Sequence, residues 1–297
     1  MGPRGAGHYV KMVHNGIEYG IMQLICETYD IIRCGMGLSA PEISLLFKEW
    51  NNTELNSYLF EVTSKVLSKM DPGTNKPLVD FILDTAEQKG TGKWTAQDAL
   101  DLGVPVPTLT TAVIARILSG AKQERVAASE ILRGRTKKFT SDKSRFISRV
   151  RQAFTIAVVG CYAQGFAQLR AASEEYKYNL KFDEVARIWK GGCIIRAKLL
   201  DPIRAAFQKE PGLRNLMLAP YFRKLINRTG SGLREVVKKA IDFGTPCPAF
   251  SNTLAYIDSY RQKRLPANLL QAQRDYFGAH TYRRIDKEGV FHTEWDK

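Results

Sequence analysis

Apolar residues recur every three to four positions along most of this chain. That spacing puts them on one face of a helix, and the alternation typical of strands is nearly absent. Start signals such as SAPEIS at Ser39 and TAQDAL at Thr95 open several of the periodic stretches. The pattern predicts an all-α protein with helices over residues 10–33, 40–51, 55–70, 78–89, 95–102, 107–125, 141–177, 182–196, 203–210, 220–230, 232–243, 248–263 and 266–277. Loops are expected at residues 71–77, 88–94 and 133–144, where glycine, proline and polar residues gather.

Two short motifs occur twice. GIMQL at residues 20–24 matches GFAQL at 165–169, and EISLLFK at 42–48 matches EVARIWK at 184–190, with offsets of 145 and 142 residues. An internal duplication explains both matches, although such short motifs also match by chance. The interpretation divides a single helical domain, residues 1–297, into pseudo-repeats of about 8–130 and 141–265 and a C-terminal segment of about 266–297.

A polar stripe interrupts the first apolar stretch. Its members follow the spacing i, i+3, i+4, i+7 and so share one face of a helix: Lys11, His14, Asn15 and Glu18. With the 145-residue offset, the second copy has apolar or small residues there, so packing does not require the polar ones: Ile156, Val159, Gly160 and Ala163. The stripe is therefore a candidate site placed on a core helix.

This stripe has the composition of an acid–base couple. In apolar surroundings the pKa of a lysine falls and that of a glutamate rises, which suits Lys11 as a general base and Glu18 as a general acid. The alternative is a buried Lys–Glu salt bridge beside a core histidine. Seven residues is two helical turns, longer than the ideal spacing for such a pair, and the unmatched second copy favours chemistry.

The charge of the chain widens the choice of ligands. Its 297 residues carry a formal net charge of +14, which attracts polyanions, phosphorylated metabolites or acidic surfaces. A nucleic-acid binder stays open on charge, but no recognition-helix motif is present. The five cysteines have no CxxC pair and the histidines no metal-ligand spacing, so no metal is expected. Neither a signal peptide nor a membrane span is predicted, and a cytoplasmic location is expected.

Further basic residues are candidates for binding an anion. QKGTGKW places Lys89 beside two glycines, like a phosphate cradle but without the full GxxxxGK[ST] spacing, so a plain turn is the alternative. Arg116 lies among apolar residues, where an arginine that extends its head group to solvent is the alternative. Arg274 and His280 flank a turn, and a helix end with a surface imidazole is the alternative.

Several longer motifs occur together in a familiar order. The chain resembles the 6-phosphogluconate dehydrogenase family in GAGHYVKMVHNGIEYG, QKGTGKWT, YAQGFAQLRAAS, WKGGCIIRAKLL and LPANLLQAQRDYFGAHTY, from residue 5 to residue 295. The resemblance implies NADP-dependent oxidative decarboxylation of 6-phosphogluconate to ribulose 5-phosphate and CO2 in the pentose phosphate pathway. It implies that Lys11 takes the proton of the 3-hydroxyl as hydride leaves C3, and that Glu18 then protonates C1 of the enediol. His14 and Asn15 would hydrogen-bond the substrate's hydroxyls and carboxylate.

The resemblance also implies a phosphate subsite and a shared active site. Tyr19, Lys89 and Arg116 would bind the phosphate end. Arg274 and His280 belong to a C-terminal segment that in the family reaches into the partner subunit, so a homodimer would share its sites. No metal is required, because a β-keto acid loses CO2 once its ketone is polarised.

The resemblance covers only the family's helical part. The sequence contains neither the GxGxxG turn nor the βαβ pattern of the family's N-terminal Rossmann domain, so most NADP contacts are expected to lie outside it. We expect the chain alone to bind NADP poorly and to turn over slowly or not at all. A non-catalytic dimerisation or substrate-binding fragment of the family is the alternative, and the intact Lys11 and Glu18 argue against it.

Overall fold

The computed structural model describes residues 1–134, 136–137 and 139–296, and its regular elements there are helices. This confirms the predicted all-α class. The α-helices are α1 (Ala6–Asp30), α2 (Ala40–Trp50), α3 (Tyr58–Ser68), α4 (Thr91–Asp101), α5 (Pro107–Gly120), α6 (Lys122–Ile131), α7 (Lys143–Glu175), α8 (Phe182–Lys190), α9 (Leu200–Lys209), α10 (Pro220–Phe243), α11 (Pro248–Tyr260) and α12 (Ala267–Gly278). A π-helical turn (Ile31–Gly35) extends α1, and short 3-10 turns occur at Leu78–Phe81 and Leu216–Leu218. None of the helices described is long and apolar enough to cross a membrane.

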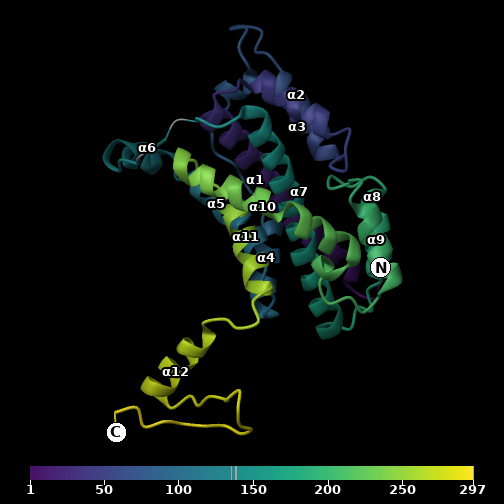
Figure 1. The fold of residues 1–297 in the computed structure, drawn as a ribbon. Coiled ribbons are helices and arrows are strands. Elements are labelled where there is room, and N and C mark those ends of the chain that lie inside the picture. Colours follow the sequence, from purple (N-terminus) through teal and green to yellow (C-terminus); the bar gives the residue numbers. More distant parts are fainter. Residues whose placement is uncertain (135, 138, 297) are drawn as a thin grey trace. The chain divides into compact units, whose positions relative to one another are not determined.

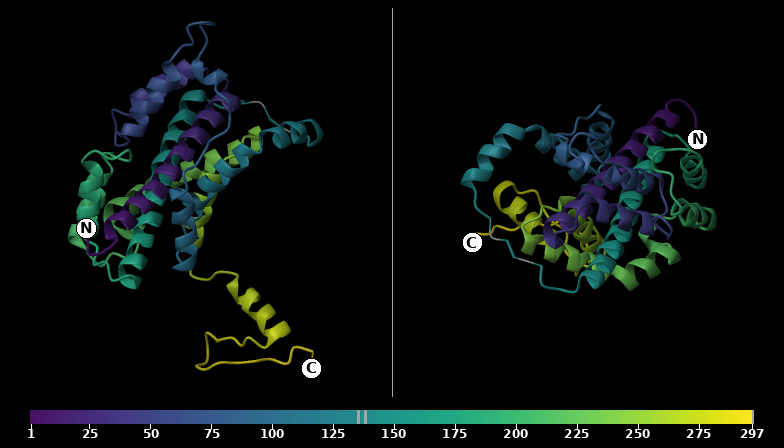
Figure 2. Two further views of the ribbon diagram at one scale, coloured as in Figure 1. Left: turned by 180° about the vertical axis from the view of Figure 1, so that it is seen from behind. Right: turned by 90° about the horizontal axis from the view of Figure 1, so that it is seen from above.

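The chain forms two compact units, Met1–Leu254 and Ala255–Lys297. In the first unit the long helices α1 and α7 lie side by side, and α10 packs along α7 (Figures 1 and 2). The pairing follows from the sequence, because both helices are apolar around much of their circumference and bury long runs of side chains such as Val13, Ile17, Ile156 and Val159. Helices with that composition are stable only inside a core.

Two shorter helices begin inside this core, where their first amide groups need acceptors. The side-chain oxygen of Gln164 on α7 accepts a hydrogen bond from the Thr108 amide of α5 at 3.0 Å. The carboxylate of Glu27 on α1 accepts hydrogen bonds from the Ala249 and Phe250 amides of α11, at 2.8 and 3.0 Å. Each core helix therefore supplies a polar cap to another helix, and these caps account for polar groups in otherwise apolar segments.

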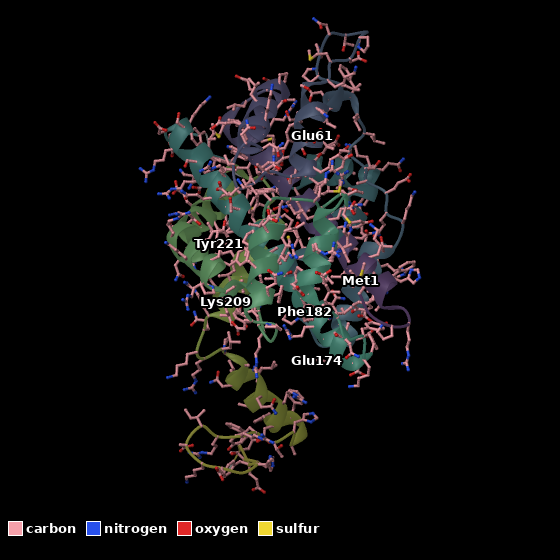
Figure 3. The ribbon with its side chains drawn as sticks, turned by 90° about the vertical axis from the view of Figure 1, so that its right-hand side faces the viewer. Met1, Glu61, Glu174, Phe182, Lys209 and Tyr221 are labelled. Atoms are coloured by element: carbon pink, nitrogen blue, oxygen red, sulfur yellow. The ribbon has the colours of Figure 1, made fainter. Side chains whose placement is uncertain are left out.

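Two helical hairpins pack on the long helices. The hairpin of α2 and α3 follows α1, and that of α8 and α9 follows α7. Phe182, labelled in Figure 3, begins α8 and packs its ring against Phe166 of α7 and Phe207 of α9, with centroids 6.3 and 5.4 Å away. A long helix followed by two short ones thus occurs in both halves, which is compatible with the duplication. The duplication and the boundaries of its repeats remain predictions.

The predicted helix over residues 78–89 is wrong. Only a 3-10 turn forms at Leu78–Phe81, and residues 82–89 lack helical structure. The apolar side chains that suggested a helix are exposed, with Phe81, Ile82 and Leu83 between 53% and 63% accessible. A short helix gains its stability by burying its apolar face, and this segment finds no core surface to cover.

Other boundaries also differ from the prediction. The stretch 107–125 is two helices, since α5 ends at Gly120, and α8 ends at Lys190 just before two glycines. Residues 220–243 form one helix instead of two. A Cβ on Gly232 would lie within 3 Å of the Gln152 side chain on α7. This glycine therefore allows α10 to approach α7 closely and does not end a helix.

Candidate active site

The predicted polar stripe lies along α1 and is hydrogen-bonded within itself. Lys11 Nζ donates to Asn15 Oδ1 at 2.7 Å and lies 3.3 Å from His14 Nδ1. His14 Nδ1 also lies 3.1 Å from Asn15 Oδ1 and 3.7 Å from a carboxylate oxygen of Glu18. Glu18 therefore contacts His14 and not Lys11. The stripe is a connected chain of polar groups and not a direct Lys11–Glu18 salt bridge.

Burial along the stripe differs from the sequence interpretation. Lys11 is exposed, so the apolar surroundings expected for this amine are not found. His14 is the buried member, with 1% of its surface accessible, and its Nε2 atom has no hydrogen-bond partner among the residues that the structure describes. Burial, reinforced by the charge of Lys11, lowers the pKa of His14 to about 4 despite the opposing hydrogen bond with Asn15. The imidazole is therefore neutral at pH 7.

Glu18 is half-buried, with 16% of its side chain accessible. Burial raises the pKa of its carboxyl, and the charges of Lys11 and Arg116 oppose that rise. A carboxyl with a raised pKa retains a proton to higher pH and is better suited to act as a general acid. This agrees with the direction expected from the sequence.

The N-terminus of α4 meets the stripe. Gly90 precedes the helix with φ +96°, and the Thr91 hydroxyl accepts a hydrogen bond from Asn15 Nδ2 at 2.7 Å. Two glycines permit this approach, because a Cβ on Gly16 would lie 2.5 Å from Thr95 and a Cβ on Gly92 would lie 2.5 Å from the Tyr19 ring. Sequence reasoning assigned residues 88–94 to a loop and missed Thr91. The Gly-Thr-Gly spacing within that loop was the available signal.

Tyr19 is buried between α1 and its neighbours and carries Arg116 on its ring. The guanidinium carbon of Arg116 lies 3.4 Å from the Tyr19 centroid, and Arg116 Nη1 donates to the Glu87 carbonyl at 3.4 Å. The Ala86 amide donates to Ser119 Oγ at 2.9 Å. These contacts fasten the non-helical segment 82–89 to α5, and this segment leads to the exposed Lys89. The structure thus brings Tyr19 and Arg116 together beside Glu18.

Arg274 and His280 belong to the second unit, and both are exposed. That unit is organised around the fully buried Asp275, whose carboxylate accepts hydrogen bonds from the Thr281 and Thr293 amides, from His292 Nδ1 and from the Trp295 indole. Burial acts to raise the pKa of Asp275, but the His292 and other hydrogen bonds outweigh it and hold the pKa at about 2. Asp275 therefore stays charged and fixes the segment that contains both candidates.

Within the part of the chain that the structure describes, no three His, Cys, Asp or Glu side chains are grouped so that they could hold a metal ion. The polar groups of the first unit's site are a lysine, a neutral imidazole, an amide and a carboxyl, with an arginine beside them. This set can bind an anionic polyol and exchange protons with it at two places.

Comparison with known proteins connects this site to a family. A family model described as 6-phosphogluconate dehydrogenase, C-terminal domain, matches residues 7–295. The Bacillus subtilis NADP(+)-dependent, decarboxylating 6-phosphogluconate dehydrogenase is 57% identical over 100% of this chain, and the Escherichia coli decarboxylating enzyme is 55% identical over 99%. The chain spans 64% and 63% of the lengths of these two relatives.

A solved structure gives the same match. It is described as Plasmodium falciparum 6-phosphogluconate dehydrogenase in its apo form, with its cofactor NADP+ and with its substrate 6-phosphogluconate. It superposes with a TM-score of 0.96 at 44% identity and covers 99% of this chain and 63% of that one. The chain therefore belongs to the 6-phosphogluconate dehydrogenase family and corresponds to its C-terminal domain.

Proposed function

We propose that this chain is the helical portion of an NADP-dependent, decarboxylating 6-phosphogluconate dehydrogenase. The observation that carries the proposal is the hydrogen-bonded stripe on α1, in which Lys11 and Asn15 are joined at 2.7 Å and Glu18 follows on the same face. An amine and a carboxyl whose pKa is raised by burial, on one helix face, suit a reaction that removes one proton and adds another.

In this proposal the two ends of the stripe act at different steps. Lys11 takes the proton of the substrate's 3-hydroxyl as that carbon is oxidised, and the resulting ammonium polarises the ketone while CO2 leaves. Glu18 gives its proton to the carbon that lost CO2, and ribulose 5-phosphate results. The raised pKa of Glu18 supports the second role, because burial shifts that carboxyl toward the protonated form that a general acid needs.

His14 and Asn15 bind and orient the substrate in this scheme. His14 is neutral, since burial lowers its pKa to about 4, and a neutral imidazole can accept or donate a hydrogen bond to the substrate. The Asn15 amide is fixed from both sides, by Lys11 and by the Thr91 hydroxyl. Thr91 is therefore a positioning residue for Asn15.

The phosphate of the substrate is assigned to the cations beyond Glu18. Arg116 on its Tyr19 platform and Lys89 at the end of segment 82–89 supply positive charge. Arg274 and His280 would complete the subsite from the C-terminal segment of a second subunit. The apolar face of α5 supports such a dimer, because Ile114, Ile117 and Leu118 share that face and are 56–59% exposed.

The residues described here do not fit the cofactor. They form helices and isolated β-bridges, without the parallel sheet and glycine-rich turn that hold a dinucleotide. We propose that NADP, which would accept the hydride, is bound mainly by a domain outside this sequence, and that the chain alone turns over slowly or not at all. A substrate-binding or dimerisation fragment without catalysis is the second candidate, and the exposed apolar face of α5 is the observation that suits it.

Activity measured with an added NADP-binding domain tests the proposal. Formation of NADPH from 6-phosphogluconate is expected with the wild-type chain and is expected to fall by roughly 10²–10⁴-fold in Lys11→Met. Lys48→Met, which removes an exposed lysine on α2, serves as the control. Equal turnover by Lys11→Met and wild type would contradict the assignment of the base. Substrate binding without turnover in any variant would favour the fragment.

A further inference from the structure

The side-chain amide of Gln271 connects the two candidate substrate residues of the second unit. Its Oε1 atom accepts a hydrogen bond from Arg274 Nη1 at 3.1 Å, and its Nε2 atom donates to the Thr281 carbonyl at 2.6 Å, directly after His280. We propose that Gln271 is a positioning residue that sets Arg274 and His280 together for an anionic substrate. This inference rests on the proposed function, which assigns both residues to the substrate's phosphate end.

The turn that presents His280 is strained. The residues on either side of it, Ala279 and Thr281, have φ values of +47° and +60°, in the left-handed region that favours glycine. For the β-branched Thr281 this conformation is a genuine outlier, and it persists only where the surroundings hold it. Strain of this kind gathers at sites that need a side chain in one particular place.

The amide and the carbonyl of Thr281 both form hydrogen bonds with side chains of α12. Its amide donates to the buried carboxylate of Asp275 at 2.9 Å, and its carbonyl accepts from Gln271 at 2.6 Å. The Ala279 amide donates to the Asp275 carbonyl, also at 2.9 Å. The Asp275 carboxylate has four hydrogen-bond partners that maintain the unit's fold, whereas among the described residues the Gln271 side chain hydrogen-bonds to Thr281 and Arg274 alone. Gln271 is therefore the residue that can be changed without dismantling the unit.

The neutrality of Gln271 matters for an anionic ligand. Among the residues described, Arg274 has the uncharged Gln271 oxygen as its partner, and no carboxylate pairs with it. The guanidinium keeps its full charge, and most of its five N–H groups stay available for a phosphate. A glutamate at position 271 would still contact Arg274, but it would cancel that charge and would repel the Thr281 carbonyl instead of donating to it.

Calorimetric titration of the full chain with 6-phosphogluconate tests the role. Gln271→Ala is expected to weaken binding roughly three- to tenfold, the factor given by loss of one net hydrogen bond, and Gln271→Glu is expected to weaken it more. Gln273→Ala, an exposed glutamine on the same helix, is the matched control and should bind as wild type does. Equal affinity in wild type and both Gln271 variants would overturn the proposal.

A mutant cycle distinguishes a Gln271 that positions Arg274 and His280 from a Gln271 that contacts the ligand itself. If Gln271 acts through Arg274 and His280, Gln271→Ala should have little further effect in a chain that already carries Arg274→Ala and His280→Ala. A full three- to tenfold loss in that background would show that Gln271 contacts the ligand itself and would overturn the positioning role.

Hydrogen exchange tests the same inference without substrate. In Gln271→Ala the Thr281 amide should exchange at least several-fold faster, while the Tyr282 and Phe291 amides, which pair with each other's carbonyls at 2.8 Å, should keep their protection. If wild type fails to bind 6-phosphogluconate, the proposed function of the chain is in question, yet this exchange result still decides the positioning role. Unchanged exchange at Thr281 would overturn it.

Discussion

The central guanidinium carbon of Arg116 lies over the ring of Tyr19, 3.4 Å from the ring centroid. Tyr19 comes from α1, next to Glu18, and Arg116 comes from α5. The contact therefore fixes a cation of one helix beside the acid of another. A cation over an aromatic face is stabilised by the ring's quadrupole, and this arrangement pre-orients Arg116 before any anion arrives.

Two substitutions at Tyr19 separate the ring from its hydroxyl. Tyr19→Phe keeps the platform under Arg116 and should weaken 6-phosphogluconate binding at most about tenfold, the effect of one hydrogen bond. Tyr19→Leu removes the platform as well and should weaken binding further, by about 0.5–2 kcal/mol. Calorimetric titration of both variants measures the difference. If the Tyr19→Phe and Tyr19→Leu variants bind 6-phosphogluconate equally well, the ring does not position Arg116.

A methyl group at Gly92 should disturb the same region from the other helix. The Cβ of Gly92→Ala would lie 2.5 Å from the Tyr19 ring, so α4 or the ring must move. We expect a loss of about 1–3 kcal/mol in the free energy of unfolding, measured by urea denaturation, together with weaker substrate binding. Gly120→Ala has open space around its Cβ and is the matched control. Wild-type stability in Gly92→Ala would show that the helices are less tightly packed than the structure indicates.

The fold class could be predicted because it depends on periodicity, which the sequence displays directly. The failures have a common physical origin in tertiary contacts. Residues 78–89 have helical spacing, but Phe81, Ile82 and Leu83 find nothing to cover them. Gly232 resembles a helix end, but it serves the close approach of α10 to α7. In both places the partner surface decides the outcome, and the partner is distant in sequence.

The candidate site was partly predictable for the same reason. The spacing of Lys11, His14, Asn15 and Glu18 on one helix face is a local property, and the stripe forms as expected. Which member is buried depends on neighbours such as Trp189, whose ring lies 5.9 Å from that of His14. The sequence assigned the apolar setting to Lys11, whereas the packing buries His14.

The buried His14 predicts that stability falls in mild acid. Its folded-state pKa is about 4 against an ordinary 6.5, so between these values the unfolded chain binds the extra proton. The contribution of the neutral, buried His14 to the free energy of unfolding is fully present above pH 6.5. It is lost as pH falls toward 4, a change of about 3 kcal/mol. Denaturant unfolding of wild type and His14→Gln across this range measures it, with the exposed His8→Gln as control. A constant difference between wild type and His14→Gln would contradict the lowered pKa.

Glu27 predicts a dependence of opposite sign. This carboxyl is 3% exposed, and burial raises its pKa to about 7, against the lowering effect of hydrogen bonds from the Ala249 and Phe250 amides and from Gln23. Between pH 4.5 and 7 the folded state holds the proton that the unfolded chain releases. Its stabilising contribution is therefore greatest below pH 4.5 and declines by about 3 kcal/mol as pH rises through 7.

The opposed contributions of His14 and Glu27 overlap between pH 4.5 and 6.5, so the wild-type stability curve conceals both. Single variants expose them. The stability of wild type relative to Glu27→Gln should fall as pH rises from 4.5 to 7, whereas that relative to His14→Gln should rise over the same range. Glu49→Gln, on the exposed face of α2, should show neither trend. If the Glu27→Gln difference instead rose with pH, the amides at the start of α11 would hold Glu27 ionised, and its pKa would be lowered by the helix end it caps.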